Sequence, residues 1–245
     1  MTAVELDASW ALGDKLHGGY LLRTLVGPVL NPDHPHPLSV SAHFLSSPAP
    51  GPASVEVTVL RTGRRVATSR AQLVQDGRVC VEALVATGTL GPAAAYWRDP
   101  SGRPELVPVE QCLRVEPDRP GEMRLGHMGH VDLRLDLASY AVPAARVAGW
   151  LTMAGQDPAD PLDALDLLVL ADAMPPVTFG IGLSGWVPTV ELTVHVRSLP
   201  APGRLRGVQQ ARLLQDGWLD EDCDLWDGDG NLVVQARQLA GYRLP

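Results

Sequence analysis

The chain has little positive charge and almost no lysine. Its 245 residues include 20 Lys and Arg against 28 Asp and Glu, a formal net charge of −8, and Lys15 is the only lysine. A nucleic-acid-binding protein needs a basic patch, so we expect no nucleic-acid partner. No run of apolar residues approaches the roughly 18 that a membrane-spanning helix requires, so we also expect no membrane span.

Cysteine is scarce as well. Cys80, Cys112 and Cys223 are odd in number and far apart, which argues against a disulfide framework and provides no zinc-type spacing. Residues 1–10 lack the basic start and the apolar segment of a secretory signal. We therefore predict a cytoplasmic protein with reduced thiols and no bound metal.

What the sequence does contain is an internal repeat. Residues 37–51 and 189–203 align without gaps at an offset of 152; they share His43 with His195 and end on the same Pro-Ala-Pro-Gly sequence. Apolar residues alternate along both segments, which is typical of a half-buried β-strand that ends in a turn. A chain of this length can form one large domain or two of about 120 residues, and the repeat favours two.

Asp-Gly dipeptides predict further hairpins. They occur at 76–77 and 229–230, each just before an alternating segment, and at 216–217 in the second half. Asp-Gly between alternating segments is a strong signal for a two-residue β-turn. Each half is therefore predicted to contain an antiparallel meander of three or four strands.

One helix is predicted ahead of each meander. Residues 162–173 are apolar nearly all round, with Asp160 as the N-cap, Pro161 in the first turn and prolines at 175–176 after the end. The matching helix of the first half runs from about residue 17 to 26. Because a helix that is apolar on every side must be enclosed, the sequence predicts an α+β fold, the double hot-dog, in which each antiparallel sheet curls around one helix.

We place an N-terminal hot-dog domain at residues 1–95 and a C-terminal one, with the catalytic residues, at 126–245. Residues 96–125 are rich in proline and arginine and are predicted to be the linker. The outer edges of the sheets could pair with further copies of the chain, so a homo-oligomer through sheet edges stays open.

Polar residues interrupt the apolar pattern of the second half. Asp172 lies near the end of the apolar helix, where burial and the helix dipole both disfavour a charge. It is either a solvent-facing residue at the helix end or a buried carboxylate that acts on water or substrate. Gln238 shares the parity of the apolar residues in its strand, where the first repeat has Val85, so its amide must find partners. Thr189 begins its strand and is unremarkable alone.

The chain resembles the acyl-CoA thioesterase II family of double hot-dog enzymes along almost its whole length. In that family an Asp, a Thr and a Gln activate the hydrolytic water, and they fall on Asp172, Thr189 and Gln238. The resemblance implies hydrolysis of fatty acyl-CoA to fatty acid and CoA without a cofactor. It rests on short motifs, at residues 16–22, 43–45 and 60–66 in the first half and 171–172, 180–182, 189–191 and 234–238 in the second.

The segment between the Asp and the Thr is shorter here than in the bacterial prototypes of that family. This departure leaves the accepted acyl-chain length open. The sequence as a whole leaves open whether the thiol carrier of the substrate is CoA or a carrier protein.

Gly18 and Gly19 open the first predicted helix. The N-terminus of a helix offers backbone N–H groups to the charge that builds on a thioester oxygen, so we hypothesise that this pair forms the oxyanion hole and contacts substrate. Tight packing of the helix against its surroundings is an equally good reason for two adjacent glycines.

Other functions find less support. Residues 182–185 lack the Gly-x-Ser-x-Gly pattern of serine hydrolases. His127 and His130 could share a metal, but no third ligand is evident. The acidic run at 220–229 lacks the calcium-loop pattern and predicts a solvated hairpin. The main alternative is a non-catalytic double hot-dog protein that binds acyl-CoA or an acyl carrier.

Overall fold

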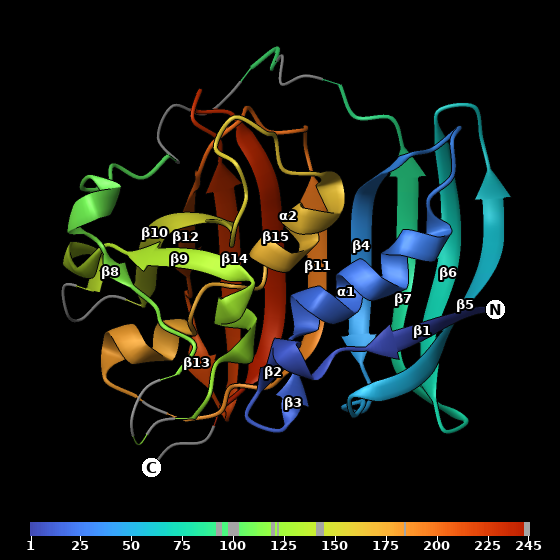
Figure 1. Cartoon of the computed structure of the whole chain (residues 1–245), viewed down its shortest axis with the longest axis horizontal. Helices are drawn as coiled ribbons and strands as arrows, with labels where there is room; N and C mark the ends of the chain where they lie inside the picture. Colours follow the sequence, from blue (N-terminus) through green and yellow to red (C-terminus); the bar gives the residue numbers. More distant parts are fainter. Residues whose placement is uncertain are drawn as a thin grey trace.

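The computed structural model consists of two similar halves with one α-helix each (Figure 1). It describes residues 1–91, 95–97, 103–118, 121, 123–140, 145–183 and 185–242. The first half contains β1 (Thr2–Leu6), β2 (Ala11–Leu12), β3 (Lys15–Leu16), α1 (Gly18–Val26), β4 (His36–Phe44), β5 (Gly51–Thr62), β6 (Val66–Gln75) and β7 (Arg78–Gly88). The second contains β8 (Leu113–Arg114), β9 (Val131–Leu135), β10 (Arg146–Met153), α2 (Ala164–Leu170), β11 (Thr189–Val196), β12 (Leu205–Gln210), β13 (Leu214–Gln215), β14 (Trp218–Trp226) and β15 (Leu232–Gly241).

One antiparallel sheet of thirteen strands runs through both halves. The strand order is β1-β5-β6-β7-β4-β11-β15-β14-β12-β10-β9-β8, with β13 paired to β14. The halves meet where β4 pairs with β11, and these two strands contain the sequence repeat. Ser41 and Thr193, which are equivalent in the repeat, pair with each other, and their hydroxyl oxygens lie 3.0 Å apart. An approximate two-fold axis therefore passes between these two residues.

Two of the three predicted Asp-Gly turns form; at 229–230 only the glycine has positive φ, and β14 and β15 are joined by a longer loop, so the two-residue turn predicted there was wrong. Asp76, between β6 and β7, has φ 51°, and Asp216, between β13 and β14, has φ 54°; the glycine after each also has positive φ. Positive φ at both central residues is the conformation of the two-residue turn that matches the twist of paired strands. These turns fix the register of the hairpins on either side.

Helices α1 and α2 lie side by side on one face of the curled sheet (Figure 1). Residues 167–170 of α2 are all completely buried, and so are Leu22, Leu25 and Val26 of α1. The two helices and the strands around them share one hydrophobic cluster. The prediction of a double hot-dog, with an enclosed helix in each half, is confirmed.

Helix α2 is shorter than the sequence pattern predicts, and Asp160 as its N-cap was wrong. The cap is Asp163, whose side chain accepts the N–H of Asp166 at 2.7 Å, while the Asp166 side chain accepts the N–H of Asp163 at 3.1 Å. This reciprocal capping box fixes the first turn at Ala164. At the other end the helix stops at Leu170, so that Asp172 lies in the turn that follows.

The sheet ends at β1 on one side and at β8 on the other. Strand β8 lies within the range predicted as the linker, where it pairs with β9 and so extends the sheet of the second half. The division at residues 95 and 126, and association through the sheet edges, stay predictions. Within the described residues, no helix has the length and apolar character needed to cross a bilayer.

We expect Leu168→Ala to lower the free energy of unfolding by about 2–5 kcal/mol, because it leaves a cavity beneath the enclosed helix α2. Urea denaturation followed by circular dichroism measures the change. The matched control is Leu84→Ala, whose side chain on β7 is 53% exposed and whose loss should change stability by about 0.5 kcal/mol or less. Equal effects of the two substitutions would contradict an enclosed α2.

Candidate active site

A cavity of about 400 Å³ lies between the two halves. It is bounded by the start of α1, the segment after α2, the end of β4 and the start of β11. Asp172, Thr189 and Gln238, three residues singled out in the sequence, all line this one cavity, and so does Gly18. Most of the remaining lining is apolar, as is usual for a pocket that binds a small organic ligand.

The Asp172 side chain, just after the end of α2, contacts the start of α1. The backbone N–H of Gly19 donates to Asp172 Oδ2 at 2.7 Å, and the Asp172 side chain keeps only 13% exposure. Burial raises the pKa of Asp172 above its usual value, although the nearby His17 and the Gly19 hydrogen bond act in the opposite direction. The carboxyl follows the C-terminus of its own helix, yet it contacts the N-terminus of the neighbouring one, where a negative charge is favoured.

The His17 side chain also links the start of α1 to Asp172. Its Nδ1 accepts the N–H of Tyr20 at 3.2 Å, as the N-cap of α1, and its Nε2 lies 2.9 Å from the backbone oxygen of Asp172. Because Nδ1 accepts, Nε2 must be the nitrogen that bears the hydrogen and donates. The ring stacks on His127 with centroids 4.6 Å apart, and burial lowers the pKa of His127 to about 2. An uncharged His127 therefore packs beside His17.

Thr189 and Gln238 are joined by a hydrogen bond. Thr189 Oγ1 donates to Gln238 Oε1 at 2.7 Å across the paired strands β11 and β15. The register of these strands shifts between Thr189 and Glu191, so the start of β11 departs from regular alternation. Gln238 has the inward parity predicted from the sequence, and its amide has found the partners that burial demands.

Glu221, on β14, is a polar residue of the cavity that the sequence pattern does not single out. It is 1% exposed, accepts the N–H of Val177 at 2.7 Å and also accepts from Gln238 Nε2. Burial raises the pKa of Glu221, while hydrogen bonds from Val177, Gln209 and Gln238 lower it. The acidic run predicts a solvated hairpin, which is wrong for this residue.

Strand parity is the signal that could have found Glu221. Asp220, Asp222 and Asp224 alternate with it, and Asp220 and Asp222 pair with arginines on the outer face of the sheet. Glu221 instead shares the inward parity of Leu219. An acid at an apolar position of an otherwise alternating strand is the same kind of interruption that marks Gln238.

The two glycines of α1 have different surroundings. A Cβ on Gly18 would lie 2.7 Å from Asp172 Oδ2, and a Cβ on Gly19 would lie 2.8 Å from the backbone oxygens of Leu168 and Val169. Gly19 is thus needed for the close approach of the two helices, and its N–H is bound to Asp172. Gly18 lines the cavity, and its N–H, at the first position of α1, has no partner within the helix.

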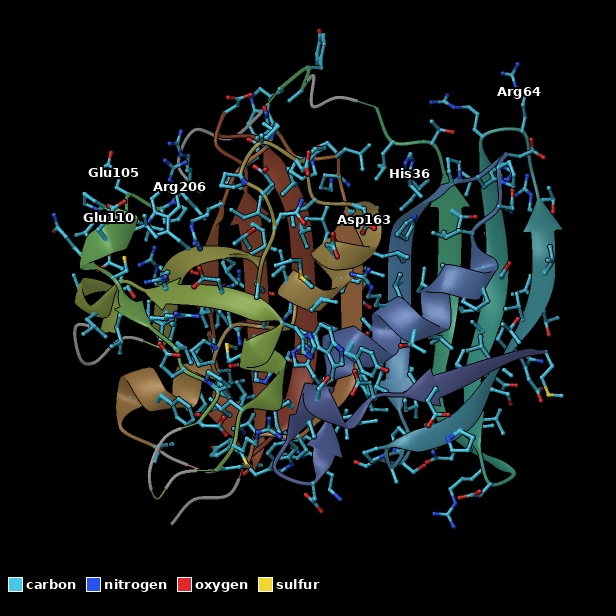
Figure 2. The ribbon with its side chains drawn as sticks, in the orientation of Figure 1. His36, Arg64, Glu105, Glu110, Asp163 and Arg206 are labelled. Atoms are coloured by element: carbon cyan, nitrogen blue, oxygen red, sulfur yellow. The ribbon has the colours of Figure 1, made fainter. Side chains whose placement is uncertain are left out.

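A second cavity, of about 650 Å³, lies at the N-terminal end of α2. It is lined by Asp163, the cap of α2, and by His36 at the start of β4 (Figure 2). The two-fold axis relates this end of the molecule to the first cavity. The counterparts of the three polar residues in the other half are apolar, and none of them is among the described residues that line this second cavity: Val26 for Asp172, nine residues after each helix cap, and Pro37 and Val85 for Thr189 and Gln238.

No group of three His, Cys, Asp or Glu side chains that could hold a metal ion occurs among the residues the structure describes. His127 and His130, considered as metal ligands in the sequence, belong instead to a set of stacked rings. His130 stacks on Trp10 with centroids 4.1 Å apart, and Trp10 stacks in turn on Tyr20 at 4.9 Å.

Two family models match the chain in succession. The N-terminal domain of acyl-CoA thioesterases matches residues 6–90, and the C-terminal domain matches residues 109–242. The chain belongs to the acyl-CoA thioesterase family. It is therefore a thioester hydrolase, and the family resemblance found in the sequence is confirmed.

Individual relatives agree with this assignment. The thioesterase is 34% identical to an uncharacterized protein of Mycobacterium tuberculosis, over 96% of this chain and 89% of that protein. A structure from Thermobifida fusca, assigned as a thioesterase II, is 37% identical, with a TM-score of 0.85 over 99% of this chain and 92% of the other. A hot-dog protein of unknown function from Alicyclobacillus acidocaldarius also reaches a TM-score of 0.85, over 99% and 93% of the two chains. At 23% identity, the latter likeness supports the fold alone.

We expect Asp172→Asn to stabilise the thioesterase at neutral pH. Because burial raises the pKa of Asp172, the folded state binds this proton more tightly than the unfolded chain, and wild-type stability falls as pH rises through the folded-state pKa. The asparagine does not titrate, so its advantage should be larger at pH 8 than at pH 4. Urea unfolding at pH 4 and pH 8 measures the difference in the free energy of unfolding. Asp160→Asn, at an exposed position, is the control. A stability difference that does not change with pH would contradict a buried, destabilised carboxylate.

Proposed function

We propose that the protein hydrolyses fatty acyl-CoA to free fatty acid and CoA with a water molecule that Asp172 activates. The water would give a proton to the Asp172 carboxylate as its oxygen attacks the thioester carbonyl. The tetrahedral intermediate then collapses, the carbon–sulfur bond breaks, and the proton passes from Asp172 to the CoA thiolate. The observation that carries the proposal is a buried acid with a raised pKa that shares one cavity with the linked pair Thr189 and Gln238.

The environment of Asp172 suits a general base. A base is most effective when its pKa approaches the working pH, and burial moves the pKa of this carboxyl in that direction. Gly19 occupies Oδ2 and holds the group in place. Thr189 and Gln238 would hydrogen-bond the same water and fix its position, so that the attacking atom needs little further ordering.

Gly18 is the better of the two glycines as a donor to the thioester oxygen. Its N–H begins α1 and the residue lines the cavity, whereas the Gly19 N–H is bound to Asp172. A helix N-terminus stabilises the negative charge that develops on that oxygen. In this proposal Gly18 contacts the substrate, while Gly19 positions the base.

Lys15 supports CoA as the thiol carrier. Among the described residues that line the cavity it is the one Lys or Arg; its side chain is 41% exposed and pairs with the exposed Asp14 at 3.1 Å, so it lies where the cavity meets solvent. CoA carries several negative charges on its phosphates, which a lysine side chain at the cavity mouth would attract. We also keep a cytoplasmic location as a prediction from the reduced cysteines.

We expect Asp172→Asn to lower the kcat for acyl-CoA hydrolysis by about 10²–10⁴-fold, the usual contribution of a general base. Thr189→Ala and Gln238→Ala should lower kcat by smaller factors, because each removes one partner of the water. Release of CoA, read with a thiol reagent over a series of acyl-chain lengths, measures the rates. Asp160→Asn is the control.

Undiminished hydrolysis by Asp172→Asn would overturn this mechanism. Absence of hydrolysis by the wild type at every chain length, with binding of acyl-CoA retained, would favour the non-catalytic alternative.

We expect Lys15→Ala to raise KM for acyl-CoA by a few-fold, because an exposed ion pair contributes about 0.2–1 kcal/mol. KM for the matching N-acetylcysteamine thioester, which has no phosphate, should not change. Arg64→Ala is the control; Arg64 lies between β5 and β6, at the far end of the first half (Figure 2). An equal change for both thioesters would argue against phosphate recognition by Lys15.

A further inference from the structure

We propose that Glu221 is a positioning residue for the hydrolysis, because it dictates which way the Gln238 amide faces and thereby the direction of the Thr189 hydrogen bond. The inference rests on the proposed function, since it concerns the water that Thr189 and Gln238 would hold. It adds a fourth polar residue to the site, one that acts through Gln238.

Three donors converge on the Glu221 carboxyl. The N–H of Val177 donates to Oε1 at 2.7 Å, Gln238 Nε2 donates to Oε2, and the Gln209 side chain is a further hydrogen-bond partner. The side chain is 1% exposed, so these protein groups take the place of solvent. A carboxylate only accepts hydrogen bonds, and the three donors oppose the effect of burial, which raises the pKa of Glu221.

This acceptor determines the orientation of the neighbouring amide. Gln238 must turn its NH₂ group to Glu221, which leaves Oε1 facing Thr189 as an acceptor. The Thr189 hydroxyl then has to donate its hydrogen to Gln238, as it does at 2.7 Å. The two hydrogen bonds thus have one fixed direction: Thr189 donates to Gln238, and Gln238 donates to Glu221.

The direction matters for the water. With its hydrogen committed, Thr189 Oγ1 can only accept from the water, while the second hydrogen of Gln238 Nε2 is free to donate to it. A water that donates to Asp172 and Thr189 and accepts from Gln238 has one lone pair left, and that lone pair is available to attack the thioester carbon. If the amide were reversed, Thr189 would donate to the water and occupy a lone pair instead.

The isosteric variant Glu221→Gln is expected to reverse the donor and acceptor roles in these two hydrogen bonds. The N–H of Val177 still requires an oxygen at the Oε1 position, so the new NH₂ group would take the Oε2 position and face Gln238. Two NH₂ groups cannot hydrogen-bond as donors to each other, and Gln238 would therefore flip and donate to Thr189. Volume and burial are retained while the hydrogen-bond direction changes.

We expect Glu221→Gln to lower the kcat for acyl-CoA hydrolysis about 10–100-fold, by analogy with the cost of losing a residue that orients a metal ligand, with little change in KM. Combining it with Gln238→Ala provides the decisive readout: in that background, Glu221→Gln should have almost no further effect on kcat. The control is Asp222→Asn, one residue along β14, where the side chain pairs with Arg212 and Arg237 on the outer face. Circular dichroism and thermal unfolding verify that each variant folds.

Full kcat in Glu221→Gln would overturn the inference, as would an equal loss with and without Gln238. If instead Asp172→Asn is fully active, the proposed function itself fails, and the two failures are thereby distinguished. The geometry predicts that Glu221→Gln lowers kcat when Gln238 is present but not in the Gln238→Ala background, in a folded protein with an unchanged KM.

Discussion

The contact on which this site depends is the hydrogen bond from the Gly19 N–H to the carboxylate of Asp172, 2.7 Å long. It joins the end of one half's helix to the beginning of the other's, and it requires two glycines because any Cβ there would collide with Asp172 or with the backbone of α2. The helix N-terminus offers this acid a favourable electrostatic environment, while burial keeps its pKa raised. The same packing that encloses both helices thus holds a carboxylate poised to take up a proton.

The approximate two-fold symmetry of the fold is broken at the proposed site. Both halves supply a helix, a meander and a central strand, and each end of the interface has a cavity. Asp172, Thr189 and Gln238 line the first cavity, whereas Val26, Pro37 and Val85 occupy the equivalent positions in the other half. One half therefore contributes the start of α1 to the site, and the other contributes the groups that would hold the water.

Much of this arrangement could be predicted from the sequence, for physical reasons. The repeat around His43 and His195 and the Asp-Gly turns specify the strands, because alternation and turn chemistry are local properties. Asp172 and Gln238 interrupt apolar patterns and can be recognised by that alone, whereas Thr189 needed the family resemblance. Glu221 was missed because its neighbours are also acidic, and the true start of α2 was missed because the capping box at Asp163 depends on side-chain geometry. Which groups meet across the two halves is a tertiary property that no local pattern contains.

In the proposed mechanism a water molecule, and not the Asp172 carboxylate, attacks the thioester. A single turnover of acyl-CoA by excess enzyme in ¹⁸O-labelled water, followed by mass spectrometry of both the fatty acid and the protein, tests it most directly. The account predicts one labelled oxygen in the released fatty acid and none in the Asp172 carboxyl. Label in Asp172 after that turnover would reveal an acyl-aspartyl intermediate and would contradict the account.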